Sequence, residues 1–287
     1  MNVQLLLRPG TTCAPLLAEA RALAVPVVVE AEMADAVANA VAAGAERVVV
    51  AGGDGTVHHA ARALLQRPPD GRPPLGIVPL GTANDLATAI GLPRDPVQAL
   101  HAALEAEPLW VDVGRCNGEA FVNGLSAGLG AVATRKASPD LKSALGAVAY
   151  LLRGLAELGN LQVHRSHITA GSATQRVDLA LLSICNSGRI GGTDLVPAAS
   201  LEDGALDLFA VVDIDPAEPG SLLAALQEFA SGEAAAAKHL WRYRAARFRI
   251  EPLGVPFETI NLDGEPYRFE GTLTVDVWPK ALPLLRV

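Results

Sequence analysis

Residues 47–66 read RVVVAGGDGTVHHAARALLQ, and this stretch decides the fold. A run of valines is followed by a glycine-rich turn and then at once by a segment with the apolar spacing of a helix. Glycine has no Cβ atom to keep phosphate oxygens away from backbone N–H groups, and the unpaired amides at the start of a helix attract anions. The stretch therefore predicts a strand, a phosphate-binding turn at residues 52–56 (the first glycine turn), and a helix.

The first glycine turn does not match either of two common nucleotide-binding motifs. The chain contains no GxxxxGKS/T sequence, which excludes a P-loop, and the turn lacks the GxGxxG spacing of a dinucleotide-binding motif. Asp54 lies inside the glycine run. A carboxylate is tolerated beside triphosphate oxygens when a Mg²⁺ ion lies between them, as in phosphoryl-transfer sites. The turn therefore favours phosphoryl transfer that depends on Mg²⁺.

A second stretch, residues 75–93, repeats this arrangement with the sequence LGIVPLGTANDLATAIGLP, and its turn at residues 81–85 is called the second glycine turn. Thr82 and Asn84 can hydrogen-bond a nucleotide or cap the short helix that follows. Asp85 can bind a metal ion or orient an acceptor hydroxyl group. Capping alone explains this turn equally well when it is taken by itself. A second glycine turn after a neighbouring strand favours a ligand site.

Strand and helix patterns alternate from residue 1 to about residue 110, and the opening MNVQLLLRPG predicts a first strand rather than a signal peptide. Such alternation predicts a parallel sheet with helices on both faces and with ligands beyond the carboxyl ends of its strands. From residue 111 the apolar runs are shorter, which indicates a β-rich region with helical inserts near 138–158 and 220–237. The length of 287 residues is consistent with two domains.

Composition limits the partners and the location that we expect. The formal net charge is −8, so the molecule as a whole repels nucleic acid, and we expect no nucleic-acid partner. The three cysteines have no metal-binding spacing and indicate reduced thiols in a cytoplasmic protein. No apolar stretch has the length and freedom from charge of a membrane span. The basic and aromatic run at residues 238–252 allows contact with an anionic bilayer, although a solvated strand edge is the commoner origin of such a run.

A third stretch, INLDGEPY at residues 260–267, contains the sequence LDGE. Asp-Gly by itself is a signal for a hairpin turn, and a plain hairpin is the first interpretation. Together with GGDGT at 52–56 and PLGTANDLA at 79–87, however, this motif resembles the diacylglycerol kinase and sphingosine kinase superfamily, and most of all the bacterial YegS-type lipid kinases. The three motifs stand in the family's order, and the resemblance covers nearly the whole chain.

The resemblance implies an N-terminal α/β nucleotide-binding domain at residues 1–115, which the C-terminal tail 279–287 is a candidate to rejoin. It implies a β-sandwich lipid-substrate domain at 116–278, with catalysis in the cleft between the two. Glu265 would be the base that accepts the proton of the substrate hydroxyl, and Asp85 would be catalytic as well, in a network of Mg²⁺ and phosphate. The residues implied to contact ATP are Gly52, Gly53, Asp54, Gly55, Thr56, Val57, His58, Thr82 and Asn84.

The resemblance extends to AASLEDGALDL at residues 198–208, which looks like the family's structural metal loop. It implies a metal ion, Mg²⁺ or Ca²⁺, bound by the backbone of Ser200, the carboxylate of Asp203 and the backbone of Ala205. An Asp-Gly turn that joins two strands is an equally good interpretation. His58 departs from the family's pattern, because relatives often have asparagine at this position.

The implied reaction transfers the γ-phosphoryl group of ATP to a lipid hydroxyl during transient contact with the inner face of a membrane. Diacylglycerol, phosphatidylglycerol, a sphingoid base and an undecaprenyl-type alcohol all offer a hydroxyl, and all four stay open. An NAD kinase shares GGDG, but the LGTAND segment and the late DGE argue against it. A non-catalytic nucleotide- or lipid-binding module would have no need to keep Asp54, Asp85 and Glu265 together.

Overall fold

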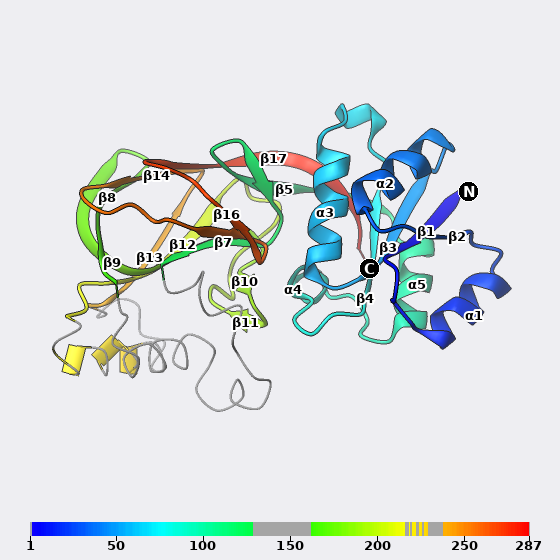
Figure 1. The fold of residues 1–287 in the computed structure, drawn as a ribbon, viewed down its shortest axis with the longest axis horizontal. Coiled ribbons are helices and arrows are strands. Elements are labelled where there is room, and N and C mark those ends of the chain that lie inside the picture. Colours follow the sequence, from blue (N-terminus) through cyan, green and yellow to red (C-terminus); the bar gives the residue numbers. More distant parts are fainter. Residues whose placement is uncertain are drawn as a thin grey trace.

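The structure, a computed structural model, describes residues 2–128, 162–215 and 238–286, and also 218, 220, 221, 224, 225, 227 and 228. The helical insert expected near 138–158 lies outside the described residues, as does most of the one expected near 220–237. In the described part of the chain, no helix is long and apolar enough to cross a membrane. Figure 1 shows an α/β part, which contains the N-terminus, beside a part built of strands.

The α/β part is a parallel sheet with helices on both faces, as the sequence predicts. In spatial order its strands are β2 (Val27–Val29), β1 (Val3–Leu7), β3 (Arg47–Gly52) and β4 (Leu75–Pro79). One face is covered by α2 (Met33–Ala42) and α3 (Asp54–Leu65), and the other by α1 (Ala14–Ala22) and α5 (Pro96–Glu105). The valines of β3 alternate between the two resulting hydrophobic clusters, so this strand is buried on both faces.

The β-rich part consists of antiparallel strands around a separate core that includes Phe121, Leu182 and Phe248. The expected β-sandwich is confirmed in this part of the chain. Its strands are β5 (Pro108–Cys116), β6 (Glu119–Phe121), β7 (Gly124–Gly128), β8 (His164–Ala170), β9 (Ala173–Cys185), β12 (Leu206–Val212), β13 (Leu240–Ala245), β14 (Arg247–Pro252), β15 (Ile260–Leu262) and β16 (Glu265–Tyr267). A separate short hairpin joins β10 (Arg189–Ile190) to β11 (Thr193–Asp194).

The last strand, β17 (Leu273–Leu285), belongs to both parts of the molecule. Its beginning pairs with β14 of the β-rich part, and near its end Leu284 pairs in parallel with Leu75 of β4. β5 runs antiparallel beside it, with an irregularity between Trp278 and Leu282. Figure 1 shows β5 and β17 extending from one part to the other. Residues of the C-terminal tail therefore add to the N-terminal sheet.

A buried aspartate holds this irregular stretch of β17 in place. Asp112 is only 1% exposed, and its Oδ1 accepts the Lys280 N–H at 2.8 Å. Its Oδ2 accepts the Gly204 N–H at 2.7 Å. Lys280 has a left-handed backbone, with φ of +47°. Asp112 thus connects the bulge of β17 to the loop before β12.

Candidate active site

The two glycine turns lie in contact because β3 and β4 are neighbours in the sheet. The carbonyl of Gly52 accepts the Leu80 N–H at 2.9 Å. A Cβ atom on Gly81 would lie 2.5 Å from the Cα atom of Gly53, which is closer than two carbon atoms can approach. Glycine is therefore required for the two backbones to come this close. The two turns therefore lie against each other at the carboxyl ends of β3 and β4.

Asp54 begins α3, and its side chain reaches across to the second glycine turn. Its Oδ2 accepts the Asn84 N–H at 2.9 Å, and its Oδ1 accepts the Asp85 N–H at 2.7 Å. These bonds satisfy N–H groups at the start of α4 (Asp85–Ala89), which would otherwise lack a partner. Burial raises the pKa of the Asp54 carboxyl, while the same two N–H groups oppose the rise. Asp54 therefore fixes the position of one turn relative to the other.

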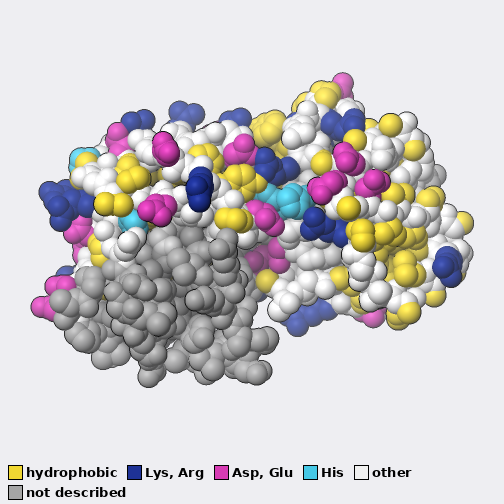
Figure 2. Space-filling view, viewed as in Figure 1, with side chains coloured by type: hydrophobic (Ala, Val, Ile, Leu, Met, Phe, Trp, Pro, Cys, Tyr) yellow, Lys and Arg dark blue, Asp and Glu magenta, His cyan; other side chains and the backbone are white. Residues whose placement is uncertain are grey.

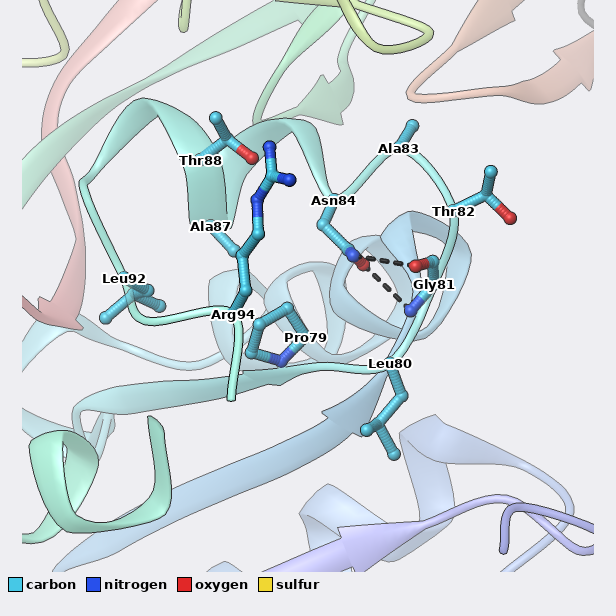
Figure 3. Close-up of a pocket in the computed structure, with 10 residues that line it drawn as sticks. All are labelled: Pro79, Leu80, Gly81, Thr82, Ala83, Asn84, Ala87, Thr88, Leu92 and Arg94. Carbon is cyan, nitrogen blue, oxygen red and sulfur yellow. Dashed lines mark hydrogen bonds between the residues drawn. The ribbon is translucent and has the colours of Figure 1, made fainter. Parts of the chain in front are cut away.

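Asn84 closes the second glycine turn and does not cap the helix with its side chain. Its backbone is left-handed, with φ of +49°. Its Oδ1 accepts the Gly81 N–H at 2.9 Å, and its Nδ2 donates to the Gly81 carbonyl at 2.8 Å (Figure 3). Capping of α4, which the sequence offered as the simple role of this turn, is thus performed by Asp54 from another helix.

Asp85 connects the α/β part to the β-rich part. Its carboxylate accepts the Gly191 N–H at 2.6 Å and the Gly192 N–H at 2.8 Å, and both glycines lie in the hairpin between β10 and β11. The residue is only 5% exposed. Burial, followed by the negative charge of Asp54, raises the pKa of Asp85 to about 6, although the two N–H groups and Arg189 oppose this.

Glu265 lies beside the first glycine turn, although it is more than 200 residues away from that turn in the chain. It follows a two-residue hairpin turn in which Asp263 and Gly264 have φ of +51° and +93°, the geometry of a type I′ turn. A Cβ atom placed on Gly55 would lie 3.2 Å from Glu265 Oε1. The Glu265 side chain is 41% exposed, and His59 Nε2 lies 3.9 Å from its Oε1. Figure 2 shows histidine, acidic and basic side chains gathered where the two parts meet. The LDGE motif is thus a hairpin turn that also places the Glu265 carboxylate beside the first glycine turn.

Asp263 is a residue of this site that the sequence alone does not assign. Its carboxylate accepts the backbone N–H groups of Val122, Asn123 and Gly124 at 2.8, 2.7 and 3.0 Å. It also lies 2.8 Å from His58 Nδ1, and both side chains are buried. An Asp-Gly pair in a sequence indicates a turn, and nothing local reveals that its carboxylate will meet four donors.

The residues predicted to contact ATP fall into two groups. Gly52, Gly53, Asp54, Gly55, Thr56, Thr82 and Asn84 lie in the two glycine turns, and Thr82 and Asn84 also line the pocket described below. The side chains of Val57 and His58 are instead surrounded by protein, Val57 in the cluster beneath α2 and His58 between Asp263 and Tyr267. A nucleotide contact by these two residues stays a prediction, and the Val57 N–H already donates to the Gly53 carbonyl at 3.1 Å.

A pocket of ≈ 340 Å³ opens beside the second glycine turn. Figure 3 shows the Arg94 side chain extending along it toward Thr88. The pocket combines apolar side chains with a few hydroxyl, amide and guanidinium groups, a mixture typical of small-molecule sites. Its lining consists of Pro79, Leu80, Gly81, Thr82, Ala83, Asn84, Ala87, Thr88, Leu92 and Arg94.

The loop at residues 200–205 forms turns that are closed by its own side chains. Ser200 Oγ accepts the Glu202 N–H at 3.2 Å, and Asp203 Oδ1 accepts the Ala205 N–H at 3.1 Å. The Asp203 carboxylate also forms an ion pair with Arg244. Among the described residues, no cluster of three or more His, Cys, Asp or Glu side chains could hold a metal ion. The metal ligands Ser200, Asp203 and Ala205 stay a prediction, and a metal ion there would compete with Arg244 for the carboxylate.

Comparison with known proteins finds family matches over both parts of the chain. The diacylglycerol kinase catalytic domain matches residues 9–116, and the YegS C-terminal NAD kinase beta sandwich-like domain matches residues 123–286. A protein of Shewanella frigidimarina named "Probable lipid kinase YegS-like" is 32% identical over 255 residues, which cover 88% of this chain and 80% of that protein. A protein of the same name from Chromohalobacter salexigens is 41% identical over 172 residues, or 59% of this chain and 55% of the relative.

A solved structure has the same fold over the full length. The crystal structure described as a "putative diacylglycerol kinase" from Bacillus anthracis superposes with a TM-score of 0.80 and covers 100% of this chain and 97% of that chain. The sequence identity is only 22%, so this similarity shows a shared fold and nothing more.

Proposed function

Because this chain belongs to the family of YegS-like lipid kinases, we propose that it transfers the γ-phosphoryl group of ATP to a lipid hydroxyl, with a diacylglycerol- or phosphatidylglycerol-like acceptor. The observation that carries this proposal is the position of Glu265. A carboxylate from the β-rich part lies beside Gly55, in the phosphate-binding turn of the α/β part. The proposed base, Glu265, and the first glycine turn thus lie side by side where the two parts meet.

The mechanism follows from this geometry. The backbone N–H groups of the first glycine turn bind the phosphates and hold them in line with the acceptor. Glu265, with 41% of its side chain exposed, can reach the acceptor hydroxyl and take its proton as the phosphoryl group arrives. Most of the catalysis comes from positioning, as in other phosphoryl-transfer enzymes.

Mg²⁺ would supply charge neutralisation on the triphosphate. The carboxylates of Asp54 and Asp85 each accept two backbone N–H groups, so each oxygen keeps a further lone pair for water or an ion. Such residues fit a Mg²⁺ ion that arrives with the triphosphate and keeps several of its waters. Asp85 would then act by electrostatics while it holds the hairpin between β10 and β11.

We also propose that the protein works in the cytoplasm and touches the inner face of the membrane transiently. β13 carries Tyr243, which is 41% exposed, among several arginines. Two of the arginines in this region are neutralised, Arg244 by Asp203 and Arg249 by Glu251. This partial neutralisation supports brief contact with an anionic bilayer rather than stable attachment.

The test is transfer of labelled γ-phosphate from ATP to a panel of lipids and to NAD, with and without Mg²⁺. We expect a labelled lipid with the intact protein and a kcat lowered about 10²- to 10⁴-fold in Glu265→Gln. Glu19→Gln, at a partly exposed glutamate whose ion pair with His101 joins α1 to α5, serves as the matched control and should keep its activity. Label in NAD would contradict the proposal, and ATP binding without transfer to any acceptor would favour a binding module.

A further inference from the structure

Three side chains on one face of α3 form hydrogen bonds with distant parts of the site. Asp54, His58 and Arg62 are four residues apart, so their side chains lie above one another on the same side of the helix. Asp54 binds the second glycine turn, as described above. His58 and Arg62 instead bind the β-rich part, and their contacts are not explained by nucleotide binding.

His58 contacts both ends of the segment that carries Glu265. Its Nδ1 lies 2.8 Å from Asp263 Oδ2, at the start of the segment, and its Nε2 lies 3.3 Å from the Tyr267 hydroxyl, at the end. The His58 side chain is 1% exposed and that of Asp263 is 0% exposed, so water does not compete for the bond between them. Glu265 lies between the two contacts, with its side chain beside Gly55.

The donors and acceptors of this network form one consistent chain. Arg62 donates to the Tyr267 hydroxyl oxygen and also pairs with Glu119 of β6. The Tyr267 hydroxyl can then donate to His58 Nε2, which leaves the Nδ1–H of a neutral imidazole to donate to Asp263. Asp263 is at the same time fixed by the three backbone N–H groups of residues 122–124. Every group on the path from α3 to the hairpin is satisfied.

We propose that His58 is a positioning residue, which fixes the β15–β16 hairpin on α3 and so sets the distance between the Glu265 carboxylate and the first glycine turn. The first glycine turn belongs to the α/β part and Glu265 to the β-rich part. α3, which begins in that turn, also contacts the hairpin that carries Glu265. This inference rests on the proposed function for its catalytic consequence, but the placement of the hairpin can be measured without any activity.

Substitutions at position 58 separate positioning from nucleotide binding. Leucine removes both contacts, and we expect kcat to fall about 10- to 100-fold while KM for ATP stays within about twofold, because a base displaced by about 1 Å loses this much rate. Asparagine places an amide N–H₂ where Nδ1 was, so His58→Asn should keep the bond to Asp263 and restore kcat to within about threefold of the intact protein.

The matched control is His101→Leu, because His101 Nε2 also lies 2.8 Å from a carboxylate, that of Glu19, but joins α5 to α1 away from the site. It should leave kcat unchanged. Tyr267→Phe removes a single hydroxyl and provides a milder variant should leucine at position 58 prevent folding. We expect it to lower kcat about three- to tenfold at constant KM for ATP.

Hydrogen exchange of residues 260–267 gives a readout that does not need activity. The backbone amides of this hairpin should exchange at least about tenfold faster in His58→Leu, or in Tyr267→Phe if leucine prevents folding, and at the native rate in His101→Leu. Unchanged kcat and exchange in His58→Leu would overturn the proposal, as would a raised KM for ATP at constant kcat, which would make His58 a nucleotide contact. If the intact protein phosphorylates no lipid, the proposed function fails, and exchange alone decides the positioning.

Discussion

At Gly81 a single hydrogen atom in place of a side chain allows the two glycine turns to touch. The Cα atom of Gly53 leaves no room for a Cβ atom at position 81, and the Asn84 Oδ1 atom lies 2.8 Å from where that Cβ would be. Gly81 does not have a positive φ, so glycine is needed here because the two backbones approach closely and not because of an unusual backbone conformation. The sequence shows the glycine, and the structure shows what approaches it.

We therefore predict that Gly81→Ala separates the two turns. The free energy of unfolding should fall by about 1–3 kcal/mol because the added methyl group forces the backbones apart. The affinity for ATP should fall as well, since we propose that both turns bind its phosphates. Urea unfolding and nucleotide titration check the two expectations.

Gly254→Ala is the control for this change, because a Cβ atom there meets nothing within 4 Å and the residue does not have a positive φ. It should change the free energy of unfolding by no more than about 0.5 kcal/mol. If Gly81→Ala keeps the native free energy of unfolding and the native affinity for ATP, the close contact between the two turns is not required for either property.

Among the elements, β17 connects the two cores because this one strand pairs with β14 of the β-rich part and with β4 of the α/β part. The connection needs a bulge, and the bulge places Lys280 in a left-handed conformation. Asp112 compensates by accepting the Lys280 N–H, and it holds the loop before β12 with its other oxygen. A buried carboxylate with such partners is stabilising only as long as the bonds remain.

We predict that Asp112→Ala lowers the free energy of unfolding by about 1–3 kcal/mol, because it removes a buried carboxylate that accepts two partly buried N–H groups. Asp178→Ala is the matched control, since Asp178 forms an exposed ion pair with Arg165 and should contribute no more than about 1 kcal/mol. Chemical denaturation of both variants provides the comparison. Equal losses in the two variants would show that Asp112 does not hold the bulge.

At the scale of the whole molecule, Asp85 links stability to pH because it lies buried between the two parts. Its pKa is raised from 3.8 to about 6 in the folded protein, so the folded state binds a proton more tightly than the unfolded state does. The contribution of this group to the free energy of unfolding is therefore greatest below about pH 4 and is lost as the pH rises to about 6. The total change is on the order of 3 kcal/mol.

The measurement is the difference in unfolding free energy between the intact protein and Asp85→Asn, without nucleotide, from pH 4 to pH 7. Titrating groups that do not interact with Asp85 cancel in this difference, so the intact protein should lose stability relative to the variant as the pH rises. A ¹³C titration of the Asp85 carboxyl should show a midpoint near 6. A difference that does not vary with pH, or that grows with pH, would contradict the buried environment of Asp85.

Features that depend on local pattern can be predicted from the amino-acid sequence. Alternating apolar runs of strand and helix length predict the parallel sheet, and the glycines after β3 and β4 predict two turns at the same edge, because parallel strands end together. The LDGE motif predicts a hairpin, and its resemblance to a lipid kinase motif singles out Glu265. The family follows from the order of these motifs, which the comparisons confirm.

Only the tertiary structure decided which groups meet across the chain. His58 and Asp263 are separated by 205 positions, and the sequence gives no signal that one will bind the other. Asp54 and Asp85 indicate a Mg²⁺ network by their residue type, yet the fold surrounds both with backbone N–H groups that only chain packing could bring there. Secondary structure follows from neighbours in sequence, whereas a hydrogen bond between distant residues depends on where packing of the two cores places its donor and its acceptor.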